Sequence, residues 1–384
     1  MIKILTFYYR SYNYGGTLQA YALCNFLYRN SLQSEQLCYQ STVARKPLLE
    51  KLKTTNFKKI LVTLRNKVRK VLFNFLVKEG ERRKRNFEKF QDLKIPHSNC
   101  IYSDKDIALS VKKGDIFIVG SDQVWNPAWT NGRYFLDFVP DNCRKIAYAA
   151  SFGVDKENMQ LYQEKINLLK CFDFVSVREE NVVEVLEKKI KKRVDLVSDP
   201  TILLTKEQWD EVSVSPIITE KYIFVYLLGN NKNHRDIVRK VSSILNLKVV
   251  FIPHIHFFYN PSDSCLSDFT VDNAGPMEFL GLIKNAEMVI TDSFHGSVFS
   301  IINEKNFWVL RRHTNTDPQN MSSRLDTLFT ELGVPSRYID EDTILSREFL
   351  KQKPDYIKVN KSLAKFRARS AKFLLDSIKF CTSK

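Results

Sequence analysis

A histidine follows an apolar run in the segment Met288 to Gly296, which reads MVITDSFHG. Residues 288–291 are typical of a buried strand, and open parallel α/β sheets hold their ligands just beyond such strand ends. An imidazole at this place can donate or accept a proton near neutral pH. Residues 297–303 read as a helix, whose first N–H groups favour an anion. The segment therefore predicts an anionic ligand beside His295.

The neighbours of His295 bear on the simplest alternative, which is a structural histidine held by hydrogen bonds. Asp292, Ser293 and Gly296 crowd the same strand end. Packing alone would favour aliphatic side chains there. This composition favours a functional site over a purely structural histidine.

A second strand end of the same kind lies between Asp115 and Pro127, which reads DIFIVGSDQVWNP. Residues 116–119 predict a short strand, and Gly120 permits a tight exit. The exit then carries hydrogen-bonding side chains on Ser121, Asp122, Gln123 and Asn126. The residue types suit a helix cap equally well, so cap and site remain alternatives for Asp122.

The amino terminus predicts a third strand end. Residues 2–9 read as a strand, residues 11–16 (SYNYGG) as a glycine loop, and residues 17–30 as an amphipathic helix. The loop resembles a phosphate cradle, but it has neither the GxGxxG nor the GxxxxGK[ST] spacing. Dinucleotide and P-loop binding are therefore not supported, and a simple turn is the alternative.

The length and element pattern predict two α/β domains. A chain of 384 residues exceeds one ordinary domain, and strands alternate with helices in both halves. Further strands are expected at 145–150, 174–177, 222–228, 247–252 and 307–310. The turn formers between Leu203 and Glu220 mark the change of domain, so we expect domains at 1–205 and 206–384.

Positive charge is concentrated in one segment. Residues 45–89 hold 16 Lys and Arg against 4 Asp and Glu, which is a local net charge of +12. The formal net charge of the whole chain is +16. Apolar residues from Phe57 to Phe75 recur at helical spacing, which predicts a basic amphipathic helix within an insertion at 45–95. The alternatives are a helical hairpin with solvated lysines or docking on anionic lipid. No stacking platform accompanies the charge, so no nucleic-acid partner is expected.

The cysteine and histidine patterns predict a protein of a reducing compartment that has no metal site. The seven cysteines are scattered and form no CxxC pair, which predicts neither disulfides nor structural zinc. No HExxH motif or histidine cluster is present, because His254 and His256 supply two ligands at most. The start of the chain lacks the apolar core of a signal peptide, so we expect a cytoplasmic location.

Several segments, taken together, resemble the polysaccharide pyruvyl transferase family. The resemblance rests on NYGGTLQAYAL at Asn13, GSDQVWNP at Gly120, YAASFG at Tyr148, VSVREE at Val175, SDPT at Ser198, GPMEFLGLIKNAEMVITDSFHG at Gly275 and SSRLDTL at Ser322. It implies two Rossmann-like domains facing a central cleft, as in GT-B glycosyltransferases, with a C-terminal helix near 363–380 packing back across the first domain. It also implies phosphoenolpyruvate as donor, a sugar diol as acceptor, a pyruvate ketal as product and no cofactor or metal.

The resemblance and the chemistry assign the candidate residues. His295 would bind phosphate and act as general acid, Arg178 would hold carboxylate or phosphate by a bidentate fork, and Asp122 would be the base for an acceptor hydroxyl. The alternative for Arg178 is a helix-start ion pair with Glu179 or Glu180. The expected substrate-binding residues are Asn13, Gly15, Gly16, Ser121, Trp125, Asn126, Asp292, Ser293, Phe294, Gly296 and Arg324.

One departure from the family pattern concerns the residues before His295. Ser293 and Phe294 stand where other members carry Arg and Leu, so a cation that can hold the donor is missing. Arg311 and Arg312 follow a predicted strand and Arg324 lies at a predicted helix start. We hypothesise that these arginines supply the missing charge.

Two other function classes remain open at this point. One is a GT-B glycosyltransferase that uses a sugar nucleotide, for which Glu278 is a candidate ribose contact. The other is a non-catalytic scaffold of a polysaccharide assembly complex. The expected partners of the transferase are phosphoenolpyruvate, a glycan or lipid-linked oligosaccharide acceptor, and an anionic membrane surface through residues 45–89. Such a protein would lie on the inner face of the plasma membrane.

Overall fold

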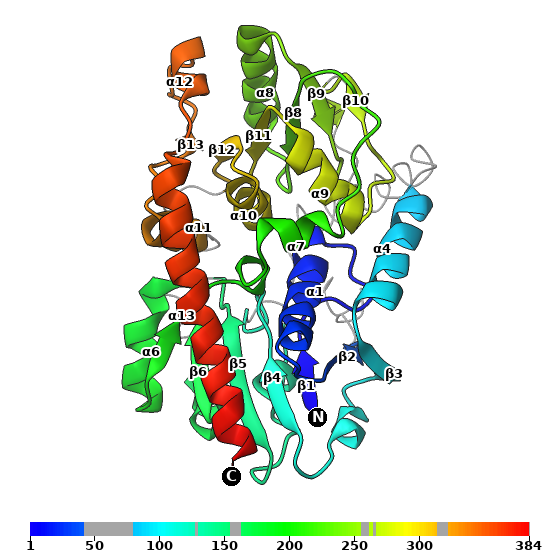
Figure 1. Ribbon diagram of the computed structural model, residues 1–384, viewed down its shortest axis with the longest axis vertical. Helices are drawn as coiled ribbons and strands as arrows, with labels where there is room; N and C mark the ends of the chain where they lie inside the picture. The colour runs from blue at the N-terminus through cyan, green and yellow to red at the C-terminus, as the bar shows by residue number, and fades with distance from the viewer. Residues whose placement is uncertain are drawn as a thin grey trace, which may run out of the picture.

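A computed structural model describes residues 1–41, 80–126, 130–153, 163–254, 261–263, 266–312 and 322–383. The predicted basic helix between Phe57 and Phe75 and the side chain of His256 lie outside these residues. The described residues form two parallel sheets flanked by helices (Figure 1). The predicted α/β class is confirmed.

The first sheet has seven parallel strands in the order β3-β2-β1-β4-β5-β6-β7. Its central strands are continuous apolar runs, such as IFIV in β4, because helices cover both faces of the sheet. The strands are β1 (Ile2–Leu5), β2 (Ser34–Tyr39), β3 (His97–Tyr102), β4 (Ile116–Val119), β5 (Arg144–Ala150), β6 (Phe174–Val177) and β7 (Val194–Leu196). The strand order reverses direction between β1 and β4, which is where α/β sheets of this kind bind ligands.

The second sheet repeats this plan with six parallel strands in the order β10-β9-β8-β11-β12-β13. These are β8 (Tyr222–Tyr226), β9 (Lys248–Phe251), β10 (Phe269–Thr270), β11 (Met288–Thr291), β12 (Asn306–Leu310) and β13 (Tyr338–Ile339). Here the order reverses between β8 and β11. The two sheets therefore have corresponding ligand positions, one in each half of the chain.

The α-helices flank the sheets and connect the strands (Figure 1). They are α1 (Tyr14–Arg29), α4 (Gly80–Lys94), α5 (Gln163–Leu168), α6 (Val183–Ile190), α7 (Lys206–Asp210), α8 (Lys232–Leu245), α9 (Pro276–Asn285), α10 (Phe294–Ile302), α11 (Ser323–Leu332), α12 (Arg347–Lys351) and α13 (Tyr356–Thr382). One buried apolar cluster contains Ile4 and Leu18 from the first half and Phe224 and Phe299 from the second. The two halves therefore share part of their core.

The helix α13 returns from the second half of the chain to the first sheet (Figure 1). The ring of Phe373 lies 6.4 Å from that of Tyr148, and Phe380 lies 5.3 Å from Phe174. The backbone N–H of Ser198 donates to the Ser370 hydroxyl at 2.8 Å. The prediction of a C-terminal helix that packs back across the first domain is confirmed.

The helix α4 joins the two halves by side-chain contacts with backbone carbonyls. Arg83 donates to the carbonyls of Asp272 at 2.7 Å and Pro253 at 2.6 Å, both in the second half. Gln91 donates to the carbonyls of Tyr8 at 3.0 Å and Ser11 at 2.8 Å, in the segment between β1 and α1. Thus α4 fixes the start of α1 relative to the second sheet.

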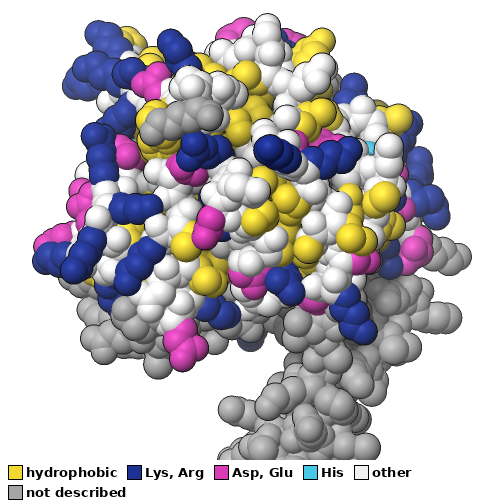
Figure 2. All heavy atoms as spheres, turned by 90° about the horizontal axis from the view of Figure 1, so that it is seen from below, with side chains coloured by type: hydrophobic (Ala, Val, Ile, Leu, Met, Phe, Trp, Pro, Cys, Tyr) yellow, Lys and Arg dark blue, Asp and Glu magenta, His cyan; other side chains and the backbone are white. Residues whose placement is uncertain are grey.

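One face of the molecule is mixed in charge (Figure 2). Figure 2 shows one face on which Lys and Arg side chains alternate with acidic ones rather than forming a single field. None of the helices in the described ranges combines the length and the apolar composition needed to cross a bilayer.

Candidate active site

The two halves of the chain meet where the start of α1 lies against the start of α10. A Cβ atom on Gly15 would overlap Nδ1 of His295, so the helix backbone lies directly beside the imidazole. The helix begins at Tyr14, which places Gly15 and Gly16 in its first turn and not in the predicted loop. The side chain of Asn13 caps this turn by accepting from Gly16 N at 3.1 Å. The glycine pair therefore lets the first half approach His295.

Asp199, just after β7, is the centre of the buried charge network. Its Oδ2 atom accepts from Arg178 Nη1 and from the Ser121 hydroxyl, both at 2.7 Å. The same atom lies 3.5 Å from His295 Nε2. Its Oδ1 atom accepts from the N–H of Thr201 at 3.0 Å and from the Thr201 hydroxyl at 2.7 Å. One carboxylate therefore links residues that follow β4, β6, β7 and β11.

The electrostatics of Asp199 keep this carboxyl ionised. Burial raises its pKa, but the opposing effects of His295 and Arg178, with the Thr201 hydrogen bond, are larger. The result is a pKa well below the ordinary value of an aspartate. A fixed negative charge therefore stands beside the imidazole.

Arg178 connects Asp199 to the predicted base. Its Nη2 atom lies 3.5 Å from Asp122 Oδ1, while Nη1 is bound to Asp199. Its Nε atom is buried and has no hydrogen-bond partner in the described part of the chain. The pairing with Asp199 and Asp122 answers the alternative of a helix-start ion pair with the neighbouring glutamates. Arg178 is an interior residue of the site with one donor left for a ligand.

Asp122 does not begin a helix. The next helical turn in the described ranges starts at Gly132 and is capped by Asn131. Asp122 has φ +71°, a conformation that aspartate adopts more readily than most residues, and its Oδ1 accepts from Gln123 N at 2.9 Å. The carboxyl keeps 20% of its surface exposed. The cap alternative is thus not supported, and the carboxyl remains within reach of a ligand.

His295 lies in the first turn of α10, which begins at Phe294, three residues before the predicted helix start at 297. Ser293 caps this helix by accepting from Gly296 N at 3.4 Å. Only 7% of the surface of His295 is exposed, and its Nε2 atom makes no hydrogen bond within the described ranges. The 3.5 Å approach to Asp199 leaves this atom able to turn toward a ligand.

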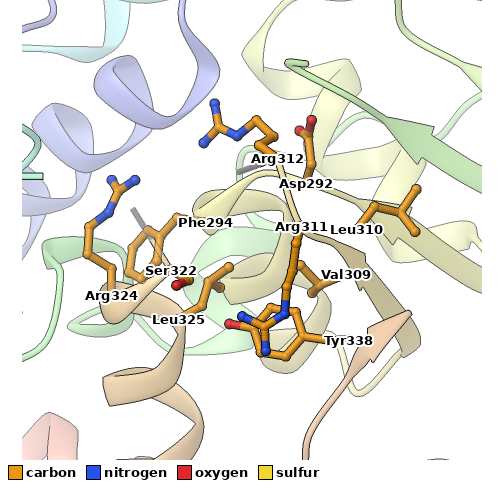
Figure 3. Close-up of a pocket in the computed structure, with 10 residues that line it drawn as sticks. All are labelled: Asp292, Phe294, Val309, Leu310, Arg311, Arg312, Ser322, Arg324, Leu325 and Tyr338. Atoms are coloured by element: carbon orange, nitrogen blue, oxygen red, sulfur yellow. The ribbon is translucent and has the colours of Figure 1, made fainter. Parts of the chain in front are cut away.

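A hollow lined by three arginines lies at the start of α10, where Phe294 forms part of its wall (Figure 3). Arg311 is used within the protein, because it pairs with Asp340 at 3.4 Å and lies 3.5 Å above the Tyr338 ring. Figure 3 shows Arg312 and Arg324 pointing away from Tyr338, on the side of Phe294 and Asp292. The complete lining is Asp292, Phe294, Val309, Leu310, Arg311, Arg312, Ser322, Arg324, Leu325 and Tyr338.

Arg324 extends from α11 toward the first half of the chain. With the Gln123 amide oriented so that its oxygen faces the guanidinium, this oxygen accepts from both terminal nitrogens, at 3.0 and 3.1 Å. Burial, with the like charge of Arg178, lowers the pKa of Arg324 to about 9. The guanidinium still carries its charge at neutral pH.

Other predicted substrate residues have internal partners. The Trp125 indole is fully buried and donates to the Tyr134 carbonyl at 2.9 Å, and the backbone N–H of Asn126 donates to the Gln123 carbonyl at 3.0 Å. The Asp292 oxygens accept the N–H groups of Leu228 and Gly229, each at 2.7 Å, which fixes the exit of β8. Glu278 accepts the Gly275 N–H at 2.9 Å within the start of α9. These contacts give each residue a positioning role.

Sequence reasoning missed Asp199 and Glu179 as site residues. The available signal for Asp199 was the SDPT segment, in which the aspartate caps a short turn at Pro200–Ile202. Glu179 is fully buried, and one of its oxygens accepts from the Ser151 hydroxyl. Burial raises its pKa despite the nearby guanidinium charges. Both carboxyls are identified by the tertiary structure, not by their local sequence.

No group of three or more His, Cys, Asp or Glu side chains in the described ranges is arranged to hold a metal ion.

A family model described as polysaccharide pyruvyl transferase matches residues 13–314. No curated protein matches the chain.

Solved structures with a similar fold include the following two. A UDP-GlcNAc 2-epimerase from Methanocaldococcus jannaschii is 13% identical, with 94% of this chain and 91% of that chain covered and a TM-score of 0.51. A putative UDP-N-acetylglucosamine 2-epimerase from Listeria monocytogenes is 12% identical, with coverage of 98% and 95% and a TM-score of 0.51. At these identities the likeness concerns the fold alone. It confirms the GT-B-like arrangement of two Rossmann-like domains.

Proposed function

This chain belongs to the polysaccharide pyruvyl transferase family, and we propose that it transfers the enolpyruvyl unit of phosphoenolpyruvate to a sugar diol. The acceptor is a bacterial polysaccharide or its lipid-linked precursor, and the product is a pyruvate ketal. The observation that carries this proposal is the Asp199 network beside a hollow lined by Arg312 and Arg324. It combines acid and base groups with cations for an anionic donor.

The donor requires several positive or N–H groups, because it has a phosphate and a carboxylate. Arg312 and Arg324 line the hollow, and their forked guanidinium groups suit either anion. The unpartnered Nε–H of Arg178 supplies a further donor. These arginines offer the charge that Ser293 and Phe294 lack.

The reaction forms two C–O bonds at one carbon. The first acceptor hydroxyl adds to C2 of the donor and loses its proton, while the C3 methylene gains a proton and becomes a methyl group. The second hydroxyl then bonds to the same carbon and loses its proton. The C–O bond to phosphate breaks, and phosphate leaves with that electron pair. The products are one ketal and one inorganic phosphate.

The site residues divide these proton movements. Asp122 accepts the proton of the first hydroxyl, and His295 supplies the proton that reaches the methylene. The imidazole then accepts the proton of the second hydroxyl, and the proton held by Asp122 leaves with phosphate. The ionised Asp199 carboxylate, 3.5 Å from Nε2, orients the ring as the proton moves. Arg178 holds both carboxylates in place and presents Nε–H to the donor.

Calorimetric titration with phosphoenolpyruvate tests the donor. We expect saturable binding by the unaltered protein, a loss of binding in His295→Ala, and unchanged binding in His97→Ala. His97 is a matched control, because it lies on β3 at the outer edge of the first sheet. Binding of UDP-sugars in place of phosphoenolpyruvate would assign a glycosyltransferase, and binding of neither would contradict the donor proposal.

We propose in addition that residues 45–89 bring the protein to anionic membrane, where a lipid-linked acceptor would lie. The support is the local charge, since 16 of the residues are Lys or Arg. Co-sedimentation with phosphatidylglycerol vesicles should exceed that with phosphatidylcholine vesicles. Replacing Lys58, Lys59 and Arg65 with Gln should weaken it, whereas replacing Lys188, Lys189 and Lys192 should not. Equal sedimentation with both vesicles would contradict this proposal.

A further inference from the structure

The Phe294 ring lies beside two guanidinium groups that come from different elements and beside the ring of His295. The guanidinium carbon of Arg178, which follows β6, lies 4.8 Å from the ring centroid. The corresponding carbon of Arg324 in α11 lies 5.6 Å from the same centroid. The neighbouring His295 ring meets Phe294 edge-on at 5.1 Å. One side chain therefore contacts or adjoins three of the groups assigned to the donor.

This contact also crosses the boundary between the two halves of the chain. Arg178 comes from the first sheet, whereas Phe294 and Arg324 come from the second half. The ring keeps only 6% of its surface exposed, so little water separates it from the guanidinium groups. A change in this ring would alter the position of both arginines at once.

The aromatic ring suits two cations that must stay available to a ligand. The Nη atoms of Arg178 already contact Asp199 and Asp122, and the terminal nitrogens of Arg324 contact Gln123. A further carboxylate would occupy more of their N–H groups and cancel their charge, whereas a ring face attracts cations without accepting another N–H bond. Arg178 Nε, which has no partner among the described residues, is consistent with this arrangement. The like charges also repel each other, and the ring offsets part of that repulsion.

We propose that Phe294 is a positioning residue that holds Arg178 and Arg324 over one ring, so that their guanidinium groups and His295 converge on one anionic group of the donor. This inference rests on the proposed function for the identity of that donor. An aliphatic side chain of similar size would fill the space but would not attract the cations. The chain thus uses an aromatic residue at this position to organise charge supplied from elsewhere.

The kinetic test compares Phe294→Leu with Phe294→Tyr, which keeps an aromatic face. Loss of cation–π contacts at two partly desolvated sites should raise KM for phosphoenolpyruvate about 10-fold in the leucine variant, with little change in kcat. The tyrosine variant should stay close to the unaltered protein. Phe349→Leu is the matched control. Phe349 lies in α12, stacks on Trp308 and is outside the proposed site. An unchanged KM in Phe294→Leu, or equal losses in the Leu and Tyr variants, would overturn the inference.

A spectroscopic test separates this inference from the proposed function. In the ¹H–¹⁵N spectrum of arginine-labelled protein, ring currents from Phe294 should shift the Nε–H signals of Arg178 and Arg324. Both shifts should disappear in Phe294→Leu and persist in Phe294→Tyr, with assignments from Arg178→Lys and Arg324→Lys. Failure of the unaltered protein to bind phosphoenolpyruvate would contradict the function, whereas unchanged arginine signals in Phe294→Leu would contradict the positioning role.

Discussion

The sheets of the two domains follow the same plan of strand order, but the side chains that they bring to the site differ. Strand ends of the first sheet provide Asp122 and Asp199, and both lie beside Arg178 within a closed network. Strand ends of the second sheet provide His295, which approaches Asp199, and Arg312, which lines a hollow. The comparison indicates that the first half holds its groups in buried ion pairs, whereas the second half places an arginine at a hollow where we propose that the donor binds.

Replacing Asp199 with Asn should have the largest effect, because it breaks the network of the first half. Removing one partner of a buried ion pair costs about 3–5 kcal/mol, and here Arg178 would remain charged. We expect the free energy of unfolding to fall by a similar amount and transfer activity to be lost. Denaturant unfolding of Asp195→Asn is the matched control, because Asp195 lies on β7, four residues before Asp199, and pairs only with the exposed Arg193 among the ion pairs of the described residues.

The same variant has a defined pH dependence. The pKa of Asp199 is lower in the folded protein than in the unfolded chain, so its stabilisation is complete above the unfolded value of about 4. This stabilisation is lost as the pH falls through the folded value. The stability difference between the unaltered protein and Asp199→Asn should therefore shrink below about pH 4. A difference independent of pH would contradict the ionised state of Asp199.

A Gly15→Ala substitution addresses the contact between the two halves. The added methyl group would overlap the imidazole of His295 and displace it. We expect activity to fall about 100-fold, with a cost in stability of about 1–3 kcal/mol from overpacking. Gly114→Ala is the contrast, because Gly114 has φ +82° and open space around it. That variant should lose stability but keep its activity.

Adjacent arginines can test the role of the second half. Arg312→Gln should weaken phosphoenolpyruvate binding about 10–100-fold, which corresponds to losing hydrogen bonds to a charged group. Arg311→Gln should change the affinity less than about threefold, because Arg311 is paired with Asp340 and stacked on Tyr338. Calorimetry provides both affinities, and similar losses in the two variants would remove the distinction between them.

Glu179→Gln should have the smallest effect on the free energy of unfolding. Burial raises the pKa of Glu179, so the unaltered carboxyl is already neutral over a range where the unfolded chain ionises. The stability of the unaltered protein should therefore fall as the pH rises above the unfolded value of about 4.3. The glutamine variant lacks this loss, so its relative stability should increase with pH. A stability difference between the two proteins that does not change with pH would contradict the raised pKa of Glu179.

The strands best predicted from sequence are those buried on both faces. The expected bounds at Ile116, Phe174 and Met288 agree with β4, β6 and β11, because apolar β-branched runs leave few alternatives. The first strand was placed too long, since β1 ends at Leu5 before a turn. The edge strand β3 was missed, because its sequence HSNCIY is partly exposed and has no sustained apolar pattern.

The site divides in the same way between local and tertiary information. Positions of His295, Arg178 and Arg324 at strand ends or helix starts could be predicted, because they depend on local sequence. Asp199 could not be identified as the centre, because its partners follow strands widely separated along the chain. The internal contacts of Trp125 also depend on packing that no single segment specifies.

The return of α13 to the first sheet has a consequence for the order of events during synthesis. Tyr148 and Phe174 pack against Phe373, which is translated only after the strands of the second sheet. The amino-terminal domain, although made first, therefore keeps an uncovered apolar face while the ribosome completes the other domain. Its nascent form is expected to need chaperone protection until the last helix emerges. Separate expression of residues 1–205 would leave that face exposed permanently.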